Sequence, residues 1–312
     1  MRVLVTGGAG FIGSHVVHDA LAAGFEVAVL DNFATGKQAN VWPGVRVFNA
    51  DLRDRDAVSS AVADFQPELV SHQAAQASVR VSVRDPRFDA EVNVVGGLNL
   101  LEACTTGARR VRRFVFASTA AIYAEVPDGE RAAESYPLDP KSPYGVSKLA
   151  FERLLTIYRE QRGLETSVLR YANVYGPRQD PRGEAGVVAI FFDSALAQKD
   201  LTVFAKRTRG DGGCSRDYVF VGDVARANLR AMTGQLPHAI VNVGTGRATS
   251  TLELAESVRR VTGSRGGIEQ GGPRQGDLER SLLDASRFEQ TLGVPTSLDA
   301  GLAHTAQWYR AH

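Results

Sequence analysis

Tyr144 and Lys148 are the two residues whose types and spacing point most directly to chemistry. They stand four positions apart, and on a helix this spacing places two side chains on one face. A tyrosine acts as a base near neutral pH only when its pKa is lowered, and a neighbouring ammonium group favours the phenolate. Pro143 is typical of the first turn of a helix. The segment therefore predicts a base catalyst, with an ordinary surface pair as the alternative interpretation of this motif alone.

Two hydroxyl side chains, Ser118 and Thr119, follow the apolar run at 114–117. Such a run is typical of a buried strand, and a doubly wound sheet binds its ligands at the carboxyl ends of its strands. A hydroxyl there could hydrogen-bond a substrate oxygen. By itself, a Ser-Thr pair at a strand end is common.

A glycine loop near the amino terminus predicts a dinucleotide site. The segment 8–13, GAGFIG, matches GxGxxG, and Gly7 adds the overlapping GxxGxxG spacing. The loop lies between the first apolar run and the first helical pattern. In that setting glycines permit a tight turn, close approach to a pyrophosphate and close helix–sheet packing, and helix amide groups meet the phosphates. A purely structural glycine turn is the disfavoured alternative.

Asp31 ends the second apolar run and favours NAD over NADP. A carboxylate there accepts the two adenosine ribose hydroxyls and repels a 2′-phosphate. No arginine occupies positions 32–36 to bind such a phosphate. Asp51 and Leu52 follow the third run and could meet the adenine edge, although an ordinary turn aspartate fits Asp51 nearly as well.

The elements that must position these side chains follow from the hydrophobic pattern. Short apolar runs alternate with amphipathic stretches in the first half of the chain, which predicts an α/β fold with a parallel, doubly wound sheet. The expected strands are 3–5, 27–30, 45–48, 69–72, 114–117 and 167–171, and the expected helices are 14–23, 57–65, 92–104 and 147–160.

The second half has a different character. Segments 177–186, 206–217 and 265–277 are polar and rich in Gly, Pro or charge, so we expect three long loops in a smaller domain built for binding. The predicted domains are 1–172, rejoined by about 218–244, and a smaller C-terminal α/β domain that comprises most of 173–312.

Bulk composition excludes several classes of protein. The 312 residues are 44% hydrophobic and 23% charged with a net charge of +1, so we expect neither nucleic acid nor membrane as a partner. No apolar run is long enough to span a membrane, and no signal peptide is expected, which predicts a cytoplasmic protein. The two cysteines, Cys104 and Cys214, lie far apart with no CxxC partner, so neither a disulfide framework nor a metal site is expected.

These motifs together resemble the extended short-chain dehydrogenases that act on nucleotide sugars, with a Rossmann sheet and a smaller substrate domain. The resemblance covers essentially the whole chain and is closest to bacterial UDP-glucose 4-epimerases. The segments that carry it are TGGAGFIG at 6–13, DN at 31–32, STAAIY at 118–123, Tyr144 with Lys148, and LRYANVYGP at 169–177.

The resemblance implies a tightly bound NAD and a catalytic set of Tyr144, Lys148 and Thr119, where many epimerases have Ser in place of Thr119. Lys148 would bind the nicotinamide ribose. The implied cofactor-binding residues are Gly7, Gly10, Phe11, Ile12, Gly13, Asp31, Asn32, Thr35, Gly36, Asp51, Leu52, Ala74, Ala75, Gln76, Ser118, Tyr144, Lys148 and Tyr171.

The second half would bind a UDP-hexose, and two phosphates require positive charge. By resemblance, Arg216 and Arg274 would bind the diphosphate. The implied substrate-binding residues are Thr119, Asn173, Val203, Arg216, Arg274, Asp277 and Ser281. Enzymes restricted to plain hexoses carry a bulky Tyr at the position of Ser281, so serine leaves space for an acetamido group and for UDP-GlcNAc or UDP-GalNAc.

The implied reaction is inversion of C4 through a transient 4-keto sugar. Ala120 and Ala121 follow Thr119 where 4,6-dehydratases need an acidic pair, which disfavours dehydration; decarboxylases also expect an acidic residue there. A UDP-glucuronate 4-epimerase stays open as an alternative, although such enzymes tend to have Thr at Asn173. A non-catalytic NAD-binding sensor is disfavoured because Tyr144 and Lys148 are both present. A homodimer through helices 92–104 and 147–160 is also implied.

Overall fold

The computed structural model describes residues 1–106, 110–181, 186–274 and 278–311, which divide into two compact units. Unit 1 comprises Met1–Ile122, Leu138–Arg170 and Val224–Val241, and unit 2 comprises Tyr123–Pro137, Tyr171–Asp223 and Asn242–His312. Residues 123–137 lie inside the predicted first domain but group with unit 2. The assignment of cofactor binding to one domain and sugar-nucleotide binding to the other stays a prediction.

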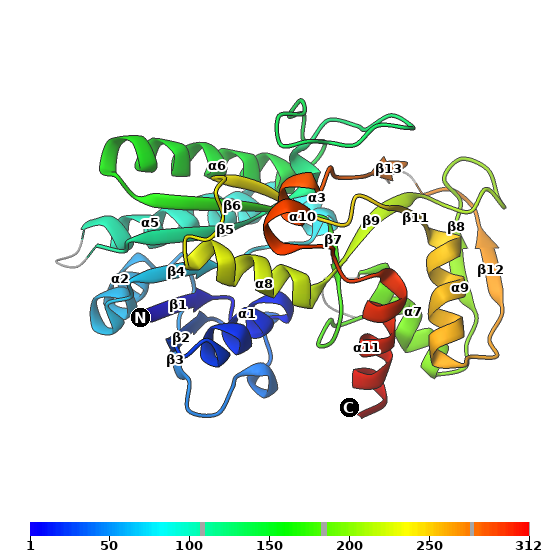
Figure 1. The fold of residues 1–312 in the computed structure, drawn as a ribbon, viewed down its shortest axis with the longest axis horizontal. Helices are drawn as coiled ribbons and strands as arrows, with labels where there is room; N and C mark the ends of the chain where they lie inside the picture. Colours follow the sequence, from blue (N-terminus) through cyan, green and yellow to red (C-terminus); the bar gives the residue numbers. More distant parts are fainter. Residues whose placement is uncertain (107–109, 182–185, 275–277, 312) are drawn as a thin grey trace. The chain divides into compact units, whose positions relative to one another are not determined.

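Unit 1 is built on a seven-stranded sheet with the strand order β10-β6-β5-β4-β1-β2-β3 (Figure 1). The pairs from β3 across to β5 are parallel, so the predicted α/β fold class is confirmed. The strands are β1 Arg2–Thr6, β2 Glu26–Asp31, β3 Arg46–Asn49, β4 Leu69–His72, β5 Arg113–Thr119, β6 Glu165–Tyr171 and β10 Ile240–Val243.

Helices cover both faces of this sheet, as its nearly continuous apolar strands require. Leu4, Leu30 and Phe116 belong to a core cluster with α2 (Arg55–Phe65), α5 (Gly97–Thr106) and α6 (Pro143–Arg162). Val3 and Val5 alternate with Leu4 along β1 and therefore point to the other face, where Figure 1 places α1 (Phe11–Ala22) and α8 (Val221–Met232). The expected helix 92–104 is a π-helix, Glu91–Gly96, followed by α5; α3 (Val79–Arg84) and α4 (Pro86–Ala90) precede it.

Helix α6 begins and ends where its sequence dictates. The Ser142 hydroxyl accepts from the Gly145 amide at 3.2 Å, Pro143 occupies the first turn, and Gly163 ends the helix at φ 67°. Phe151 and Leu155 bury one face in the core. The first turn, which carries Tyr144, is thus fixed by a capping hydroxyl and a proline.

Unit 2 combines two small sheets with helices. Strand β9 pairs with β7, β11 and β13, and β8 pairs with β12. The core packs Phe192, Val203, Leu254 and Leu302 from α7, β8, α9 and α11. The strands are β7 Asn173–Tyr175, β8 Leu201–Phe204, β9 Ser215–Phe220, β11 Ala248–Ser250, β12 Ile268–Gly271 and β13 Arg280–Ser281, and the helices are α7 Val187–Leu196, α9 Thr251–Thr262, α10 Ser286–Leu292 and α11 Leu298–Ala311.

Two of the expected loops contain strands. β9 begins at Ser215, inside the expected loop 206–217, and β12 lies inside the expected loop 265–277. Among the described residues, β12 pairs with β8 in a two-stranded sheet, so its sequence IEQG lies at a sheet edge, where polar residues are common. Within the described ranges, no helix is long and apolar enough to cross a membrane.

Candidate active site

The strand order of unit 1 reverses between β1 and β4, and the two loops that leave this point carry predicted cofactor residues. A reversal of this kind opens a crevice at the carboxyl ends of the strands. The glycine loop follows β1, and residues 73–78 follow β4. The two loops are adjacent, because the Ala74 amide donates to Thr6 Oγ1 at 3.2 Å and the Gln73 amide donates to the Thr6 carbonyl at 3.2 Å.

The glycine loop has the close approaches that its sequence predicts. A Cβ on Gly13 would lie 2.1 Å from the Gly7 carbonyl oxygen, and a Cβ on Gly7 would lie 2.7 Å from the Ala74 nitrogen. Gly7 also has φ +67°, which disfavours any other residue. The loop therefore forms a cradle lined by backbone at the start of α1, which fits a pyrophosphate.

Asp31 is held at the end of β2 by the glycine loop itself. Its Oδ2 accepts from the Ala9 amide at 2.9 Å and its Oδ1 from the Phe33 amide at 2.8 Å. A Cβ on Gly36 would come within 2.9 Å of Asp31 Oδ1. Each carboxylate oxygen keeps a second lone pair, so Asp31 can still accept from ribose hydroxyls.

Asp51 is bound more tightly within the protein than the sequence predicts. Arg53 donates to both carboxylate oxygens at 2.9 Å, and Asn32 Nδ2 donates to Oδ2 at 2.8 Å. The hydrogen bonds from Arg53 hold the pKa of Asp51 well below its usual range. Its predicted contact with adenine remains a prediction, made by a carboxylate that already has two partners.

Lys148 and Tyr144 share one face of α6, as their spacing predicts. The Lys148 ammonium lies 5.9 Å from the centroid of the Tyr144 ring and 4.8 Å from that of Phe116. It also donates to the Ala117 carbonyl at 3.0 Å, and the residue is only 3% exposed. A buried ammonium next to a phenol favours the phenolate electrostatically.

Thr119 lies at the end of β5, close to the start of α6. A Cβ on Gly145 would be 2.5 Å from the Ala121 carbonyl oxygen, so glycine lets the first turn of α6 approach this segment. Thr119 Oγ1 accepts from the Ala121 amide at 3.2 Å and keeps its proton for donation. Tyr144, Lys148 and Thr119 therefore lie together at the carboxyl ends of the strands of the sheet.

The Ser118 hydroxyl forms a hydrogen bond inside the protein core. It donates to Glu152, which forms an ion pair with Arg170 at 2.7 Å, and these three side chains are buried. Gln76 behaves similarly, because its side chain bonds to Ser78 and Asp89. A cofactor role for Ser118 or Gln76 stays a prediction, and their main-chain groups are the better candidates for it.

His72 lies at the end of β4 and is surrounded by aromatic rings. Its ring is 5.6 to 5.8 Å from those of Phe114, Phe116 and Phe151, and its Nδ1 is 2.7 Å from Thr6 Oγ1. Burial, and secondarily the charge of Lys148, lowers the pKa of His72 to about 3. The ring is therefore neutral at physiological pH and adds no charge that would compete with Lys148.

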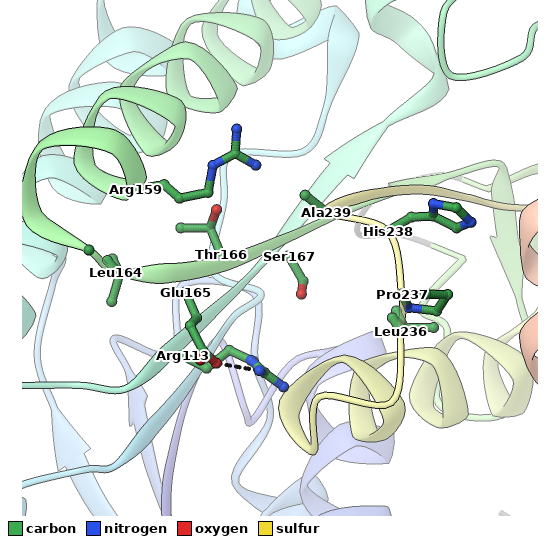
Figure 2. A pocket seen from close by; sticks show the side chains of 11 residues that line it. Arg113, Arg159, Leu164, Glu165, Thr166, Ser167, Leu236, Pro237, His238 and Ala239 are labelled. Atoms are coloured by element: carbon green, nitrogen blue, oxygen red, sulfur yellow. Dashed lines mark hydrogen bonds and ion pairs between the residues drawn. The ribbon is translucent and has the colours of Figure 1, made fainter.

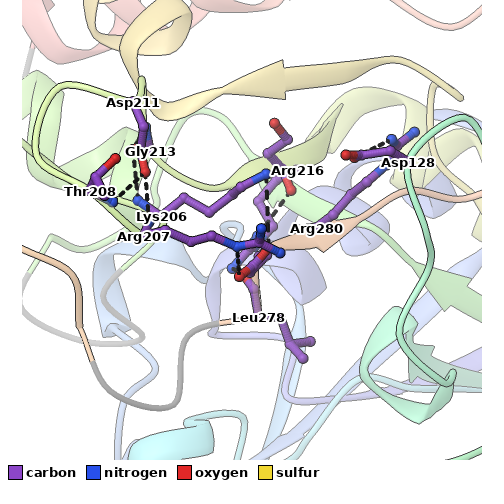
Figure 3. Close-up of polar contacts among 11 residues, drawn as sticks. Asp128, Lys206, Arg207, Thr208, Asp211, Gly213, Arg216, Leu278 and Arg280 are labelled. Carbon is purple, nitrogen blue, oxygen red and sulfur yellow. Dashed lines mark hydrogen bonds and ion pairs between the residues drawn. The ribbon is translucent and has the colours of Figure 1, made fainter.

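In unit 2, Arg216 and Ser281 stand side by side on β9 and β13. Arg216 donates to the carbonyls of Ser215 at 2.9 Å and Leu278 at 2.6 Å (Figure 3). Neither contact neutralises its charge, which keeps Arg216 suitable for a phosphate. Serine at 281 thus lies next to the predicted diphosphate ligand.

The other predicted substrate residues differ in exposure. Arg274 is exposed and stacks its guanidinium 3.4 Å from the centroid of the Phe204 ring, and Asn173 is exposed at the start of β7. Val203 is fully buried in the core of unit 2, so only its main chain could meet a ligand. Asp277 lies outside the described residues. Tyr171, a predicted cofactor-binding residue, is buried and groups with unit 2.

A cavity of about 290 Å³ lies at the opposite ends of the strands of the unit 1 sheet (Figure 2). Its lining includes Arg113 and Glu165, which begin β5 and β6, and Arg159 near the end of α6. Arg113 is paired with Glu165. This cavity is at the amino ends of the strands, away from the catalytic candidates.

The buried polar residues that support the site were not predicted. Asp89, Asn93, Ser147 and Glu152 are each less than 5% exposed. A partial signal was available, because Asp89 and Asn93 are four residues apart, a spacing that places two polar side chains on one face of a helix.

Comparison with known proteins agrees with this geometry. Residues 3–244 match the NAD dependent epimerase/dehydratase family. The UDP-glucose 4-epimerase of Thermus thermophilus, solved in complex with NAD, is 53% identical, with 99% of each chain covered and a TM-score of 0.93.

Two further relatives are similar over their full length. The UDP-glucose 4-epimerase of Thermotoga maritima, solved with UDP-glucose, is 42% identical, with 100% of this chain and 99% of that chain covered and a TM-score of 0.92. A UDP-glucose 4-epimerase of Mycolicibacterium smegmatis is 42% identical, with 99% of each chain covered. The chain therefore belongs to the NAD dependent epimerase/dehydratase family, as its motifs predicted.

Proposed function

We propose that this chain is a UDP-glucose 4-epimerase, which interconverts UDP-glucose and UDP-galactose through a transient 4-keto sugar. The main support for the proposal is that Tyr144, Lys148 and Thr119 lie at the carboxyl ends of the strands, where the glycine cradle also lies. The solved relatives, one with NAD and one with UDP-glucose, support it.

The residues of unit 1 would have separate roles in the reaction. Tyr144 would accept the proton of the C4 hydroxyl, with Thr119 hydrogen-bonded to the same oxygen. The Lys148 charge would stabilise the phenolate and bind the nicotinamide ribose. The glycine loop and Asp31 would hold NAD, which supplies the acceptor and later the donor of the C4 hydride.

Unit 2 would supply nucleotide binding. Arg216 and Arg274 are positively charged groups suited to a diphosphate, and Asn173 would donate to a phosphate. Firm binding of UDP would leave the hexose free to turn, which inversion at C4 requires.

Three parallel assays test the proposal. UDP-galactose, UDP-GalNAc and UDP-galacturonate are each incubated with the purified protein and NAD, and the C4 epimer is quantified by chromatography. We expect turnover of UDP-galactose. Turnover of UDP-galacturonate alone would replace the proposal with a UDP-glucuronate 4-epimerase, and no turnover of any substrate would refute it.

Ser281 favours a second pair of substrates, UDP-GlcNAc and UDP-GalNAc. Its small side chain lies beside Arg216 and is only partly buried, which leaves room for an acetamido group. Ser281→Tyr should remove turnover of UDP-GalNAc and retain that of UDP-galactose. Wild-type protein inactive on UDP-GalNAc would contradict this extension.

We also propose a homodimer, formed through helices of unit 1. Val83 on α3 is 65% exposed, Val146 on α6 is 53% exposed, and Val95 in the π-helix is 49% exposed. A contiguous patch of exposed apolar side chains is typical of an interface, and the proposal requires these valines to form one. Sedimentation equilibrium should give twice the chain mass, and Val83→Glu should shift it toward the monomer. The predicted cytoplasmic location stays a prediction.

A further inference from the structure

Asp89 is a buried carboxylate at which three hydrogen-bond donors meet. It lies in α4, is 0% exposed, and accepts from Ser147 Oγ at 2.6 Å, Gln76 Nε2 at 2.7 Å and Asn93 Nδ2 at 3.1 Å. Each of these donors is at most 9% exposed. An ionised carboxylate only accepts hydrogen bonds, so it suits a position where three donors converge.

One arm of this cluster fixes the loop that follows β4. Asn93 Oδ1 accepts from the Gln76 amide at 2.9 Å, and Asn93 Nδ2 donates to the Gln76 carbonyl at 2.9 Å. The Gln76 side chain in turn closes on Ser78 through two hydrogen bonds. The main chain next to Ala74 and Ala75, two predicted cofactor residues, is thus attached to the π-helix.

The other arm fixes the first turn of α6. Ser147 lies between Tyr144 and Lys148, and its hydroxyl is shared between Asp89 and the Tyr144 carbonyl, the latter at 3.0 Å. Because a hydrogen bond to a carboxylate is about twice as strong as one between neutral groups, the contact with Asp89 dominates. The turn that bears both catalytic candidates is therefore attached to the same carboxylate as the β4 loop.

We propose that Asp89 is a positioning residue that keeps Tyr144 and Lys148 correctly placed relative to the predicted cofactor-binding loop at Ala74–Gln76. The inference deepens the proposed function and rests on it for its catalytic consequence. Asp89 itself would touch neither substrate nor cofactor. It would act through Ser147 on one side and through Gln76 and Asn93 on the other.

Activity measurements with four variants test the proposal. Misplacement of catalytic groups by about 1 Å costs on the order of 100-fold in rate, so Asp89→Ala should lower kcat by about that factor. Its KM for UDP-galactose should stay within about twofold, because the proposed nucleotide ligands are in unit 2. Asp89→Asn keeps an oxygen that accepts from Gln76 and Asn93, and its new amide group can donate to the Ser147 hydroxyl, which then acts as acceptor. The kcat of this variant should therefore be within about tenfold of the wild-type value.

A matched pair of serines separates positioning from simple loss of a buried hydroxyl. Ser147 and Ser82 are both buried helix serines whose hydroxyls donate to a carbonyl three residues earlier, at 3.0 and 2.7 Å. Only Ser147 also bonds to Asp89. Ser147→Ala should lower kcat by about tenfold, less than Asp89→Ala, because it releases only one of the two segments, whereas Ser82→Ala should leave it unchanged.

Hydrogen exchange supplies a readout that is independent of catalysis. In Asp89→Ala, the amides of 74–78 and of 145–149 should exchange faster together, while those of α2 stay as in the wild type. Wild-type kcat in Asp89→Ala, or unchanged exchange in both segments, would overturn the proposal. A wild-type protein inactive on UDP-galactose would refute the proposed function instead, and the exchange result would still decide whether Asp89 positions the two segments.

Discussion

The two units hold their candidate site residues in opposite ways. In unit 1, Lys148 is 3% exposed and Asp31 is 7% exposed, and both are bonded to backbone of neighbouring segments. In unit 2, Arg274 is exposed against an aromatic ring, and Arg216 is only partly buried. Lys148 and Asp31 are thus held by the protein itself, whereas the two arginines proposed for the diphosphate remain accessible.

Different physical demands explain this contrast. Proton transfer requires atoms to be placed within fractions of an ångström, which only packed and hydrogen-bonded side chains achieve. Binding a diphosphate requires positive charge that the ligand can reach, and deep burial of an arginine would carry a desolvation cost. Changes in unit 1 should therefore act on kcat and stability, and changes in unit 2 on KM.

The largest effect is expected from Tyr144→Phe. Removal of the proposed base should lower kcat by about 1000-fold or more, while UDP binding by calorimetry stays unchanged. Tyr158→Phe is the control, because it removes a hydroxyl from the same helix, α6, away from the Lys148 contact. Comparable turnover in the Tyr144 variant and the control would remove Tyr144 from the mechanism.

The next effect concerns stability and compares two carboxylates. Glu152 pairs with Arg170 where both are buried, whereas Asp299 pairs with Arg260 at the surface of unit 2, with side chains 71% and 60% exposed. Breaking a buried pair costs about 3 kcal/mol or more, so Glu152→Gln should lower Tm by on the order of 10 °C. Asp299→Asn should leave Tm unchanged. Equal melting shifts would show that burial does not distinguish the two pairs.

Much of unit 1 was predictable because its signals are local. The glycine cradle, Asp31 and the Tyr144–Lys148 face each follow from spacing within one element. The network around Asp89 was not, because it joins three separate segments, and Ser147 lies 58 positions from Asp89 in the sequence. A buried hydrogen bond between such segments leaves no periodic pattern.

Unit 2 was less predictable for a related reason. Strands β12 and β13 are short and polar, so neither shows the alternation of a half-buried strand. The pairing of Ser281 with Arg216 depends on this register. The resemblance identified both residues, and only the structure shows that they are neighbours.

A smaller effect is expected from Arg216→Ala. Loss of a charged hydrogen-bond donor costs roughly 1.5 to 3 kcal/mol, so KM for UDP-galactose should rise by about 10- to 100-fold with kcat within about threefold. Arg207→Ala is the control, because Arg207 is 72% exposed and pairs with Glu279 at 2.6 Å (Figure 3). Steady-state kinetics on both variants check this. A fall in kcat without a rise in KM would contradict the division between the units.

The smallest effect is a pH dependence whose sign differs between the units. His72 in unit 1 has a pKa lowered to about 3 by burial, compared with 6.5 for the free side chain. Between these values the unfolded chain binds a proton that the folded chain excludes, so stability falls as the pH decreases, by up to about 1.4 kcal/mol per pH unit. The loss begins as the pH falls below about 6.5.

Asp217 in unit 2 acts in the opposite direction. Burial raises its pKa, despite hydrogen bonds from Thr245 and Gly246. The folded chain therefore takes up a proton at a higher pH than the unfolded chain does, and acidification stabilises it. Urea unfolding between pH 7 and about pH 4, close to the pKa of a free aspartate, checks both: His72→Asn should flatten the loss of stability toward acid, and Asp217→Asn should steepen it. A change of the same sign in both variants would show that the units do not differ in this respect.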